Sequence, residues 1–582
     1  MEIKNQKIND YLIYLYGNEE AEKLFNQLES LIFEFKKNNK KNQIYADRLF
    51  SHKDIILITY GDTLLEENEK PLRTLLKFFQ KYLQGIINSI HILPFFPYSS
   101  DDGFSVVDYL AVNPELGDWE DIRQFQSNEI GLMMDAVINH ISSQSDWFQK
   151  FLLDDPKYKN YFITVDPSVD LSSVTRPRTL PLITSYQTTK GKKWVWTTFS
   201  ADQIDLNYKN PDTFLDVIEV ILKYVQNGAN IIRLDAIAYL WKEIGTNCIH
   251  LPQTHTVVQL IRSILDEVDS SVLLITETNV PHEENISYFG DGNNEAHMVY
   301  QFPLPPLIAH AILIGSSRHL SAWASGLQLP SNLTSYFNFT ASHDGIGVRP
   351  LSGILPPEEM QLLVDKTLLH GGKISSKTNS DGSSSPYELN ISYFDLLNNP
   401  IDNESIEIQV KRFLVSQAIP LVLAGIPGIY IHSLLGSRNN LKGVEETGIN
   451  RTINREKLDL KLLDDELKSP TSLRSQVISG YKKLISCRIT ELAFHPNADQ
   501  KILDFSPAIF SVLRSTSEGN EIILALQNIT NQKQKITIPM NTFGDVKIKE
   551  LVDVLTQRAF SPHLEITIQM TPYEIIWLKP HN

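Results

Sequence analysis

Short apolar runs alternate with longer amphipathic segments along most of this chain. Between residues 51 and 495, runs rich in Ile, Val and Leu are followed by stretches in which apolar residues recur every three or four positions. This alternation is typical of parallel strands joined by helices that cover them, and eight such units predict an α/β fold, a (β/α)8 TIM barrel. The expected strands lie at residues 56–61, 90–95, 132–137, 231–236, 272–277, 297–302, 336–341 and 420–425.

Two intervals inside the barrel are too long to be simple connections. Residues 141–200 follow the third expected strand, and residues 345–402 follow the seventh. Barrel enzymes build their specificity in long excursions from the C-terminal ends of strands. We therefore expect both insertions to border the functional site.

The two ends of the chain follow different patterns. Residues 1–50 have a helical pattern and are expected to form an N-terminal helical extension to the barrel, which spans residues 51–495. Residues 496–582 contain short alternating runs such as Lys535, Ile536, Thr537 and Ile538, with turn-rich joints between them. That alternation predicts antiparallel strands with one covered face, hence a C-terminal β domain.

Composition narrows the class of protein. The net charge of −16 argues against a nucleic-acid partner, which would require a basic surface. No apolar run approaches 18 residues, and the N-terminus has no signal-like pattern, so we expect no membrane association and a cytoplasmic location. Cys248 and Cys487 stand alone, which predicts structural thiols rather than a disulfide or a cysteine-bound zinc site.

Three acidic residues stand at the ends of expected strands. Asp235 and Glu277 end the fourth and fifth strands, and Asp344 follows the seventh. A single acid in such a place is more often solvated or a helix cap, but three at the mouth of one barrel match retaining glycoside cleavage, which uses two carboxyl groups about 5 to 5.5 Å apart. Arg233 lies on the same strand face as Asp235, where it either keeps Asp235 ionised or forms a structural pair inside the barrel.

Several segments resemble one enzyme family. DAVINH (135–140), RLDAIAY (233–239), the strand ending at Glu277 and SHD (342–344) are similar to the four ordered motifs of the α-amylase superfamily, glycoside hydrolase family 13. LPFFPYSSDDGF (93–104), TRPRTLP (175–181), KEIGTNC (242–248) and GINRTINR (448–455) resemble its sucrose phosphorylase group. Within that group, IHLPQTH (249–255) and the segment 275–290 are most similar to glucosylglycerate and glucosylglycerol phosphorylases.

The resemblance implies a role for each matching residue. Asp235 would be the nucleophile, Glu277 the acid/base and Asp344 the stabiliser of the transition state. Other residues would bind the substrate: Asp101, His140, Arg233, His343 and Arg455 around the glucosyl ring, Phe104 as an apolar platform, Gln203 on the acceptor side, and Tyr387 near phosphate or acceptor.

No catalytic metal or cofactor is implied. His140 and His343 lack the spacing of a zinc site, and neutral imidazoles suit sugar hydroxyls. Asn139 matches a position that helps to bind calcium in some amylases, so a structural calcium stays open. The expected partners are a small α-glucoside and inorganic phosphate; the sequence assigns no oligomeric state.

Phosphate requires local positive charge in an acidic protein. Arg176 and Arg178, on either side of the stiff Pro177, are the candidates, although two solvated arginines on a surface loop would look the same. The function predicted is therefore a retaining α-glucoside phosphorylase that forms α-glucose 1-phosphate. A hydrolase of the same fold and a non-catalytic sugar-binding or assembly barrel are the alternatives.

The acceptor is not settled by the sequence. Thr175 and the pair Tyr387–Glu388 depart from the sucrose phosphorylase pattern, which makes sucrose and sucrose 6-phosphate less favoured donors. Glu388 suits a hydroxyl-rich acceptor such as glycerol and would repel a glycerate carboxylate unless an arginine intervenes. We expect glucosylglycerate or glucosylglycerol.

Overall fold

Eight parallel strands close into a barrel in the computed structural model, which describes residues 2–38, 49–378, 383–544, 548–561 and 564–581. Each strand pairs in parallel with its neighbours, and the last pairs with the first. The barrel strands are β1 (Ile56–Thr59), β3 (Ser89–Ile92), β4 (Gly131–Ala136), β9 (Ala229–Leu234), β10 (Leu273–Thr276), β11 (Met298–Tyr300), β12 (Ser335–Phe339) and β16 (Ile426–Tyr430).

The predicted fold class is confirmed, but the eighth strand was placed wrongly. Residues 420–422 are the end of helix α12 (Ile406–Val422), which continues through Pro420, and β16 begins at Ile426. The apolar run 420–425 is buried except for the partly buried Ala424, so periodicity cannot distinguish the end of a buried helix from a strand. A Cβ at Gly428 would lie 2.3 Å from the Phe337 ring, so β16 needs glycine there to pack inside the barrel.

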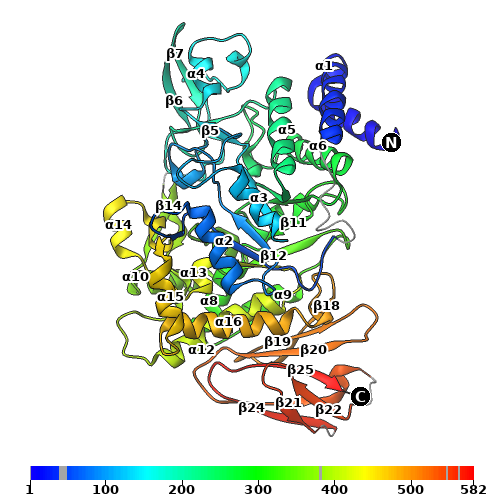
Figure 1. Ribbon diagram of the computed structural model, residues 1–582, viewed down its shortest axis with the longest axis vertical. Coiled ribbons are helices and arrows are strands. Elements are labelled where there is room, and N and C mark those ends of the chain that lie inside the picture. Colours follow the sequence, from blue (N-terminus) through cyan, green and yellow to red (C-terminus); the bar gives the residue numbers. More distant parts are fainter. Residues whose placement is uncertain (1, 39–48, 379–382, 545–547, 562–563, 582) are drawn as a thin grey trace.

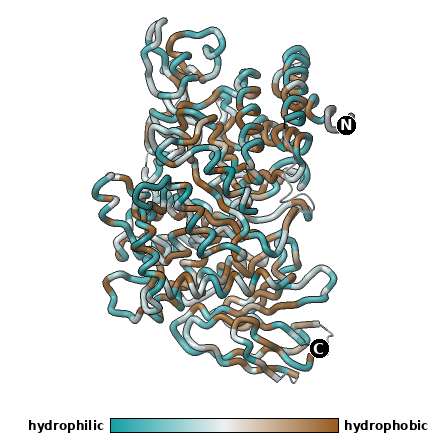
Figure 2. The backbone as a smooth tube through the Cα atoms, viewed as in Figure 1, coloured by the Kyte–Doolittle hydropathy of each residue, from teal (hydrophilic) through white to brown (hydrophobic). Residues whose placement is uncertain are grey.

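Amphipathic helices cover the barrel (Figure 1). In Figure 2 brown and teal alternate along α5 and α6, as expected for helices with one buried face. Four of them carry Pro in their first turn, where its missing N–H costs no hydrogen bond. The covering helices are α2 (Pro71–Tyr82), α3 (Trp119–Ser127), α5 (Pro211–Gln226), α6 (Pro252–Val268), α7 (His282–Ile286), α8 (Leu304–Ile314), α12 and α16 (Leu473–Arg488).

The two expected insertions follow β4 and β12. The first contains β5 (His140–Ser142), α4 (Asp146–Leu152), β6 (Ile183–Thr188) and β7 (Gly191–Trp196), and β5 pairs with β8 (Gln203–Asp205) just after it. The second contains β13 (Ile346–Gly347), α10 (Pro357–Leu369), β14 (Lys373–Thr378), β15 (Ser384–Asn390) and α11 (Tyr393–Leu397). Residues 379–382, in the Ser- and Gly-rich part of the second insertion, lie outside the described residues.

The N-terminal segment forms α1 (Glu2–Asn38), which packs against α5 and α6 (Figure 1). Residues 39–48 of the expected extension lie outside the described residues. Among the described helices, none is long and apolar enough to span a membrane. The domain boundaries near residues 50 and 495 remain a prediction.

The C-terminal region is an antiparallel β domain, as predicted. Six strands form one sheet and two form another, with a shared apolar core that includes Leu524, Ile538 and Ile568. The strands are β18 (Asp499–Ser506), β19 (Ile509–Ser515), β20 (Ile522–Asn528), β25 (Ile575–His581), β22 (Glu550–Asp553) and β23 (Ala559–Phe560), with β21 (Gln534–Pro539) and β24 (Glu565–Met570) in the second sheet.

Candidate active site

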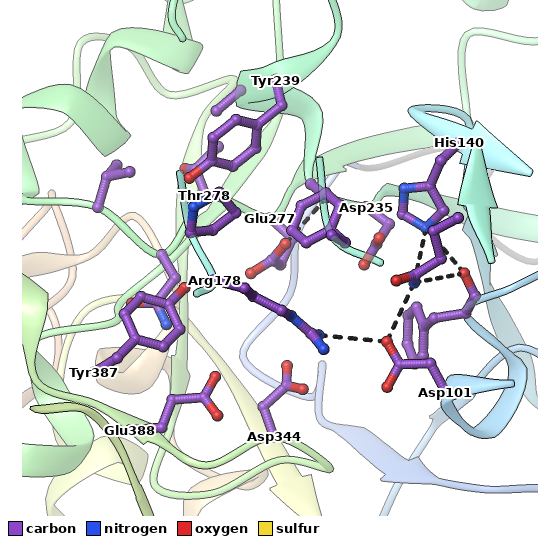
Figure 3. A pocket seen from close by; sticks show the side chains of 18 of the residues that line it. Asp101, His140, Arg178, Asp235, Tyr239, Glu277, Thr278, Asp344, Tyr387 and Glu388 are labelled. Carbon is purple, nitrogen blue, oxygen red and sulfur yellow. Dashed lines mark hydrogen bonds and ion pairs between the residues drawn. The ribbon is translucent and has the colours of Figure 1, made fainter. Parts of the chain in front are cut away.

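A partly open cavity lies at the C-terminal mouth of the barrel. Asp235 follows β9 directly, Glu277 follows β10 directly, and Asp344 lies in the loop after β12; all three line the cavity (Figure 3). Parallel strands bring their C-terminal ends to one rim, so carboxylates far apart in the sequence meet there. The other predicted residues that line it are Asp101, Phe104, His140, Arg178, Gln203, His343, Tyr387 and Glu388.

Arg233 lies just below the cavity and organises two of the carboxylates. Its Nη1 is 2.7 Å from Asp235 Oδ1, and its Nη2 is 3.9 Å from Glu277 Oε2. The same guanidinium donates to the buried Asp135 carboxylate, and its Nε donates to the Tyr300 hydroxyl at 3.1 Å. Arg233 is thus a buried cation among carboxylates rather than part of the cavity wall.

The proton of the Asp235–Glu277 pair belongs to Glu277. Burial raises the pKa of Glu277 to about 7, with Arg233 opposing the rise and the negative charge of Asp235 adding to it. Burial also raises the pKa of Asp235. Arg233, however, is 2.7 Å from Asp235 and 3.9 Å from Glu277, so it favours the ionised form of Asp235 more strongly. At neutral pH this gives one carboxylate and one carboxylic acid, the two forms that a nucleophile and a general acid require.

The backbone after Asp235 orients Glu277. Ala236 has φ +48°, a left-handed conformation that is uncommon for a residue with a side chain. In this conformation its backbone N–H donates to Glu277 Oε2 at 3.1 Å. Backbone strain of this kind is typical of sites where a side chain must be held in one position.

Asp344 lies close to two arginines and a histidine. Its Oδ1 lies 2.8 Å from Arg451 and 3.9 Å from Arg455, and its Oδ2 lies 3.5 Å from His343. Burial alone would raise the pKa of Asp344, but these groups hold it below its ordinary value. Asp344 is therefore ionised throughout the physiological range, as a group that stabilises a developing positive charge must be.

A strained turn forms one side of the cavity. Asp101 and Asp102 both have positive φ, and a Cβ at Gly103 would lie 2.6 Å from the carbonyl oxygen of Pro94. Arg455 forms an ion pair with Asp102, and Gln203 Nε2 donates to Asp101 Oδ2 at 3.2 Å. These contacts fix the Asp101 carboxylate toward the cavity.

Two neutral histidines and one aromatic ring complete this side. Burial lowers the pKa of His140, and it lowers that of His343 to about 3. Phe104 stacks on His343 with a centroid distance of 4.8 Å and an interplanar angle of 4°. Neutral imidazoles beside an apolar ring suit the hydroxyls and the C–H face of a sugar.

The two candidate phosphate-binding arginines point in different directions. Arg178 lines the cavity and lies 3.4 Å from Asp101 Oδ2 (Figure 3). Arg176 is outside the cavity wall and donates to the carbonyl oxygen of Leu180 in its own loop. Only Arg178 is placed to meet a ligand in this structure.

The second insertion delivers Tyr387 and Glu388 through β15. Glu388 is 3% exposed and accepts hydrogen bonds from Arg451 Nη2 at 2.6 Å and Nε at 3.1 Å. Arg451 is therefore the arginine that offsets the charge of Glu388. A Cβ at Gly345 would lie 2.8 Å from the Glu388 Cβ, so this glycine makes room for the carboxylate.

Not every predicted residue reaches the cavity, and some lining residues were missed. Arg233, Arg455 and Arg176 are outside the wall. Gln203 lies beside Asp101 and His140, away from the side where Tyr387 lies. Several missed residues belong to segments singled out in the sequence: Phe199 in the first insertion, Tyr239 in RLDAIAY, Thr278 and Asn279 after Glu277, and Arg451 in GINRTINR.

Lys242 occupies the position where a structural cation was considered. Its ammonium group lies 2.9 Å from Asn139 Oδ1 and 2.5 Å from Asp205 Oδ2, and its side chain is 2% exposed. Among the described residues, no cluster of three or more His, Cys, Asp or Glu side chains is arranged to hold a metal ion. The lysine supplies positive charge to these oxygens directly.

Comparisons with known proteins agree with this geometry. Residues 79–333 match the model of the α-amylase catalytic domain. The glucosylglycerate phosphorylase of Allomeiothermus silvanus is 49% identical over 91% of this chain and 94% of its own length. That of Escherichia coli is 43% identical over 99% of this chain and 100% of its own. This chain belongs to the sucrose phosphorylase group of the α-amylase family.

Solved structures support the family fold. The sucrose 6F-phosphate phosphorylase of Thermoanaerobacter thermosaccharolyticum superposes with a TM-score of 0.72, covering 89% of this chain and 98% of its own, at 24% identity. As a member of this phosphorylase group the chain is an enzyme, and its substrates are a glycoside and phosphate. The non-catalytic alternative is excluded.

Proposed function

We propose that the enzyme is a retaining glucosylglycerate phosphorylase that releases glycerate and forms α-glucose 1-phosphate. The observation that carries this proposal is the Arg451–Glu388 ion pair at the cavity wall. It removes the electrostatic objection to an anionic acceptor that Glu388 alone would raise. The identity to glucosylglycerate phosphorylases over nearly the whole chain supports the same choice.

The reaction runs through two displacements at the anomeric carbon. The Asp235 carboxylate attacks that carbon while Glu277 donates its proton to the departing oxygen of glycerate, giving a β-glucosyl enzyme. The ionised Asp344 stabilises the positive charge that develops on the sugar ring. Phosphate then attacks from the face that glycerate left, so the α configuration is retained.

Positioning favours phosphate over water in the second step. Phosphate is already anionic at neutral pH and needs less help from a general base than water does. Arg178 has a 3.4 Å contact with Asp101 and lies over the Phe199 ring, which leaves other guanidinium N–H groups to bind phosphate. The binding of phosphate in an attacking position therefore supplies most of the advantage.

Asp101, His140, His343 and Phe104 are proposed to bind the glucosyl ring. Asp101 and His140 lie on one side of Asp235, whereas Tyr239 and Tyr387 lie on the other side of Glu277 (Figure 3). Phe104 is close to the first pair, because its carbonyl oxygen lies 2.9 Å from His140 Nε2, and its ring stacks on His343. This division assigns the first side to glucose and the second to the acceptor. Arg233 and Arg455 act beneath the wall by holding Asp235 and Asp102.

A screen of four donors tests the proposal. Sucrose, sucrose 6-phosphate, glucosylglycerol and glucosylglycerate are incubated with the enzyme, with and without phosphate, and glucose 1-phosphate and free glucose are measured. We expect glucose 1-phosphate in the presence of phosphate, with glucosylglycerate the preferred donor. Equal free glucose in both conditions would establish the hydrolase alternative. A cytoplasmic location remains a prediction.

A further inference from the structure

A second arginine lies behind the acceptor side of the cavity. Arg349 follows β13 in η5 (Arg349–Leu351), and its guanidinium lies beside the Tyr239 hydroxyl. The backbone N–H of Val348 donates to the carbonyl oxygen of Tyr387 at 3.1 Å, which ties this segment to the second insertion. Arg349 is thus beside Tyr239, and the residue before it is bonded to the backbone of Tyr387.

The position of Glu277 sets where the leaving group must lie. Its carboxyl group protonates the departing oxygen, and Tyr239 and Tyr387 are on that side of it, away from Asp101 (Figure 3). Glycerate is a three-carbon acid, so its carboxylate is only a few bonds from that oxygen. Arg349, beside Tyr239, therefore borders the region in which that carboxylate must be placed.

The positive charge around Arg349 is incompletely neutralised. Among the described residues its one ion pair is the 3.3 Å contact of Nη2 with Glu284 Oε2, and the side chain of Glu284 is 41% exposed. Arg451, by contrast, is held at 2.8 Å by Asp344 and at 2.6 Å by Glu388. Arg349 therefore keeps hydrogen-bonding capacity that Arg451 has already used.

A second cation adjoins Arg349. Lys377 on β14 is half-buried, and burial together with the neighbouring Arg349 guanidinium lowers its pKa. Within the described ranges, no carboxylate forms an ion pair with Lys377. Arg349 pairs with one half-exposed carboxylate, Glu284, and Lys377 adds a second positive charge beside it, so this region favours an anion.

We propose that Arg349, assisted by Lys377, binds the carboxylate of the acceptor and thereby selects glycerate over glycerol. This inference rests on the proposed function, because it assigns the acceptor of that same reaction. It also explains how one site accepts hydroxyls through the neutralised Glu388 and a carboxylate through Arg349.

His250 and Glu284 act as positioning residues for Arg349. His250 Nε2 lies 3.1 Å from Glu284 Oε2, and its Nδ1 lies 3.0 Å from the Tyr288 hydroxyl. Burial lowers the pKa of His250, so the imidazole is neutral at physiological pH and leaves the charge of Glu284 to Arg349. His250 and Glu284 belong to the two segments, 249–255 and 275–290, that most resemble the glycerate and glycerol members.

Acceptor selectivity of variants tests the assignment. In Arg349→Met, the ratio of kcat/KM for glucosylglycerate to that for glucosylglycerol should fall roughly ten- to a hundredfold, the effect of losing a charge-assisted hydrogen bond. In Arg349→Lys, this ratio should lie between that of the wild type and that of Arg349→Met. Arg558→Met, which removes an arginine with a similar 3.5 Å contact to Glu574 in the C-terminal domain, should leave the ratio unchanged.

Two results would overturn the assignment while leaving the proposed function intact. One is an unchanged ratio in an Arg349→Met enzyme that still phosphorolyses glucosylglycerate. The other is a rise in the KM for phosphate as large as the loss of selectivity, which would assign Arg349 to phosphate. Failure of the wild-type enzyme to use glucosylglycerate would instead contradict the proposed function itself.

A measurement on the wild-type enzyme keeps the test valid if Arg349 variants do not fold. In the synthetic direction, from glucose 1-phosphate, glycerate and its uncharged methyl ester are compared as acceptors. We expect glycerate to be preferred by roughly tenfold or more, because only it carries the charge that Arg349 binds. Equal efficiency for the two acceptors would refute a carboxylate site.

Discussion

Arg451 Nη2 lies 2.6 Å from Glu388 Oε1, an ion pair between the late arginine motif and the second insertion. The same guanidinium is 2.8 Å from Asp344, so one arginine links the carboxylate proposed to stabilise the transition state to the one proposed to face the acceptor. The side chains of Arg451 and Glu388 are 20% and 4% exposed, so the pair is largely screened from water. Removal of either partner should therefore lower the stability of the enzyme measurably.

The first prediction concerns this pair. Arg451→Met should lower stability by about 3 kcal/mol, because it removes the cation paired with Glu388 and the cation nearest to Asp344, which keeps only the 3.9 Å contact with Arg455. It should also raise the pKa of Asp344 and lower kcat. Adding Glu388→Gln should restore part of the stability, and a double-mutant cycle in urea should give a coupling of about 1–3 kcal/mol. Strict additivity of the two substitutions would show that the pair is not coupled.

The second prediction concerns pH. Glu277 is active as the protonated acid, and its pKa is about 7, so kcat/KM for glucosylglycerate should fall as pH rises above that value, about tenfold per unit. α-Glucosyl fluoride, whose leaving group needs no proton, should show no such fall in the glucosylation step. The comparison is made with initial rates from pH 5 to 9. A common alkaline limb for both donors would exclude Glu277 as the general acid.

The third prediction concerns the nucleophile. Asp235→Asn should reduce phosphorolysis by more than about 10⁴-fold, because the covalent intermediate cannot form. Asp465→Asn, on a surface residue that pairs with Lys468 at 3.0 Å, is the matched control and should retain full activity. The β-glucosyl enzyme should be detectable by mass spectrometry in the wild type and absent from Asp235→Asn. Turnover of glucosides by the variant at the wild-type rate would assign the nucleophile elsewhere.

Much of the fold follows from local sequence, because buried parallel strands form continuous apolar runs. The prediction of the eighth strand was wrong, because the buried end of α12 and the strand IPGIY after it are both apolar. Only the pairing of β16 with β1 and β12 distinguishes them. Such pairing is a property of the closed barrel and not of the segment.

The positions of Asp235, Glu277 and Asp344 at the barrel mouth were predictable, because the first two directly follow β9 and β10 and the third lies in the loop after β12. The sequence did not show which of Arg451 and Arg455 lines the cavity, because both belong to GINRTINR and only four positions separate them. The short η6 helix (Asn450–Asn454) turns Arg451 into the cavity and leaves Arg455 behind it. Arg349 was also hidden, because its proximity to Tyr239 arises only when the second insertion folds over the barrel mouth.

The fourth prediction concerns the Lys242 ammonium group. Lys242→Met should destabilise the enzyme by about 3–5 kcal/mol, because the buried Asp205 carboxylate then loses its cation and keeps only the hydrogen bonds from Thr198 and Asn139. A chelator should leave the melting temperature of the wild type unchanged, since the lysine supplies the cation for Asn139 and Asp205. Both effects can be followed by differential scanning calorimetry. A chelator-dependent drop in the wild type would show that a metal stabilises this region.

The most direct test of the account is the identity and configuration of the first products. Glucosylglycerate is incubated with enzyme and phosphate, and the early time course is followed by ¹H and ³¹P NMR. Double displacement through Asp235 and Glu277 predicts α-glucose 1-phosphate and glycerate in equal amounts, with free glucose only a trace. β-Glucose 1-phosphate, or glucose released at a rate independent of phosphate, would contradict it.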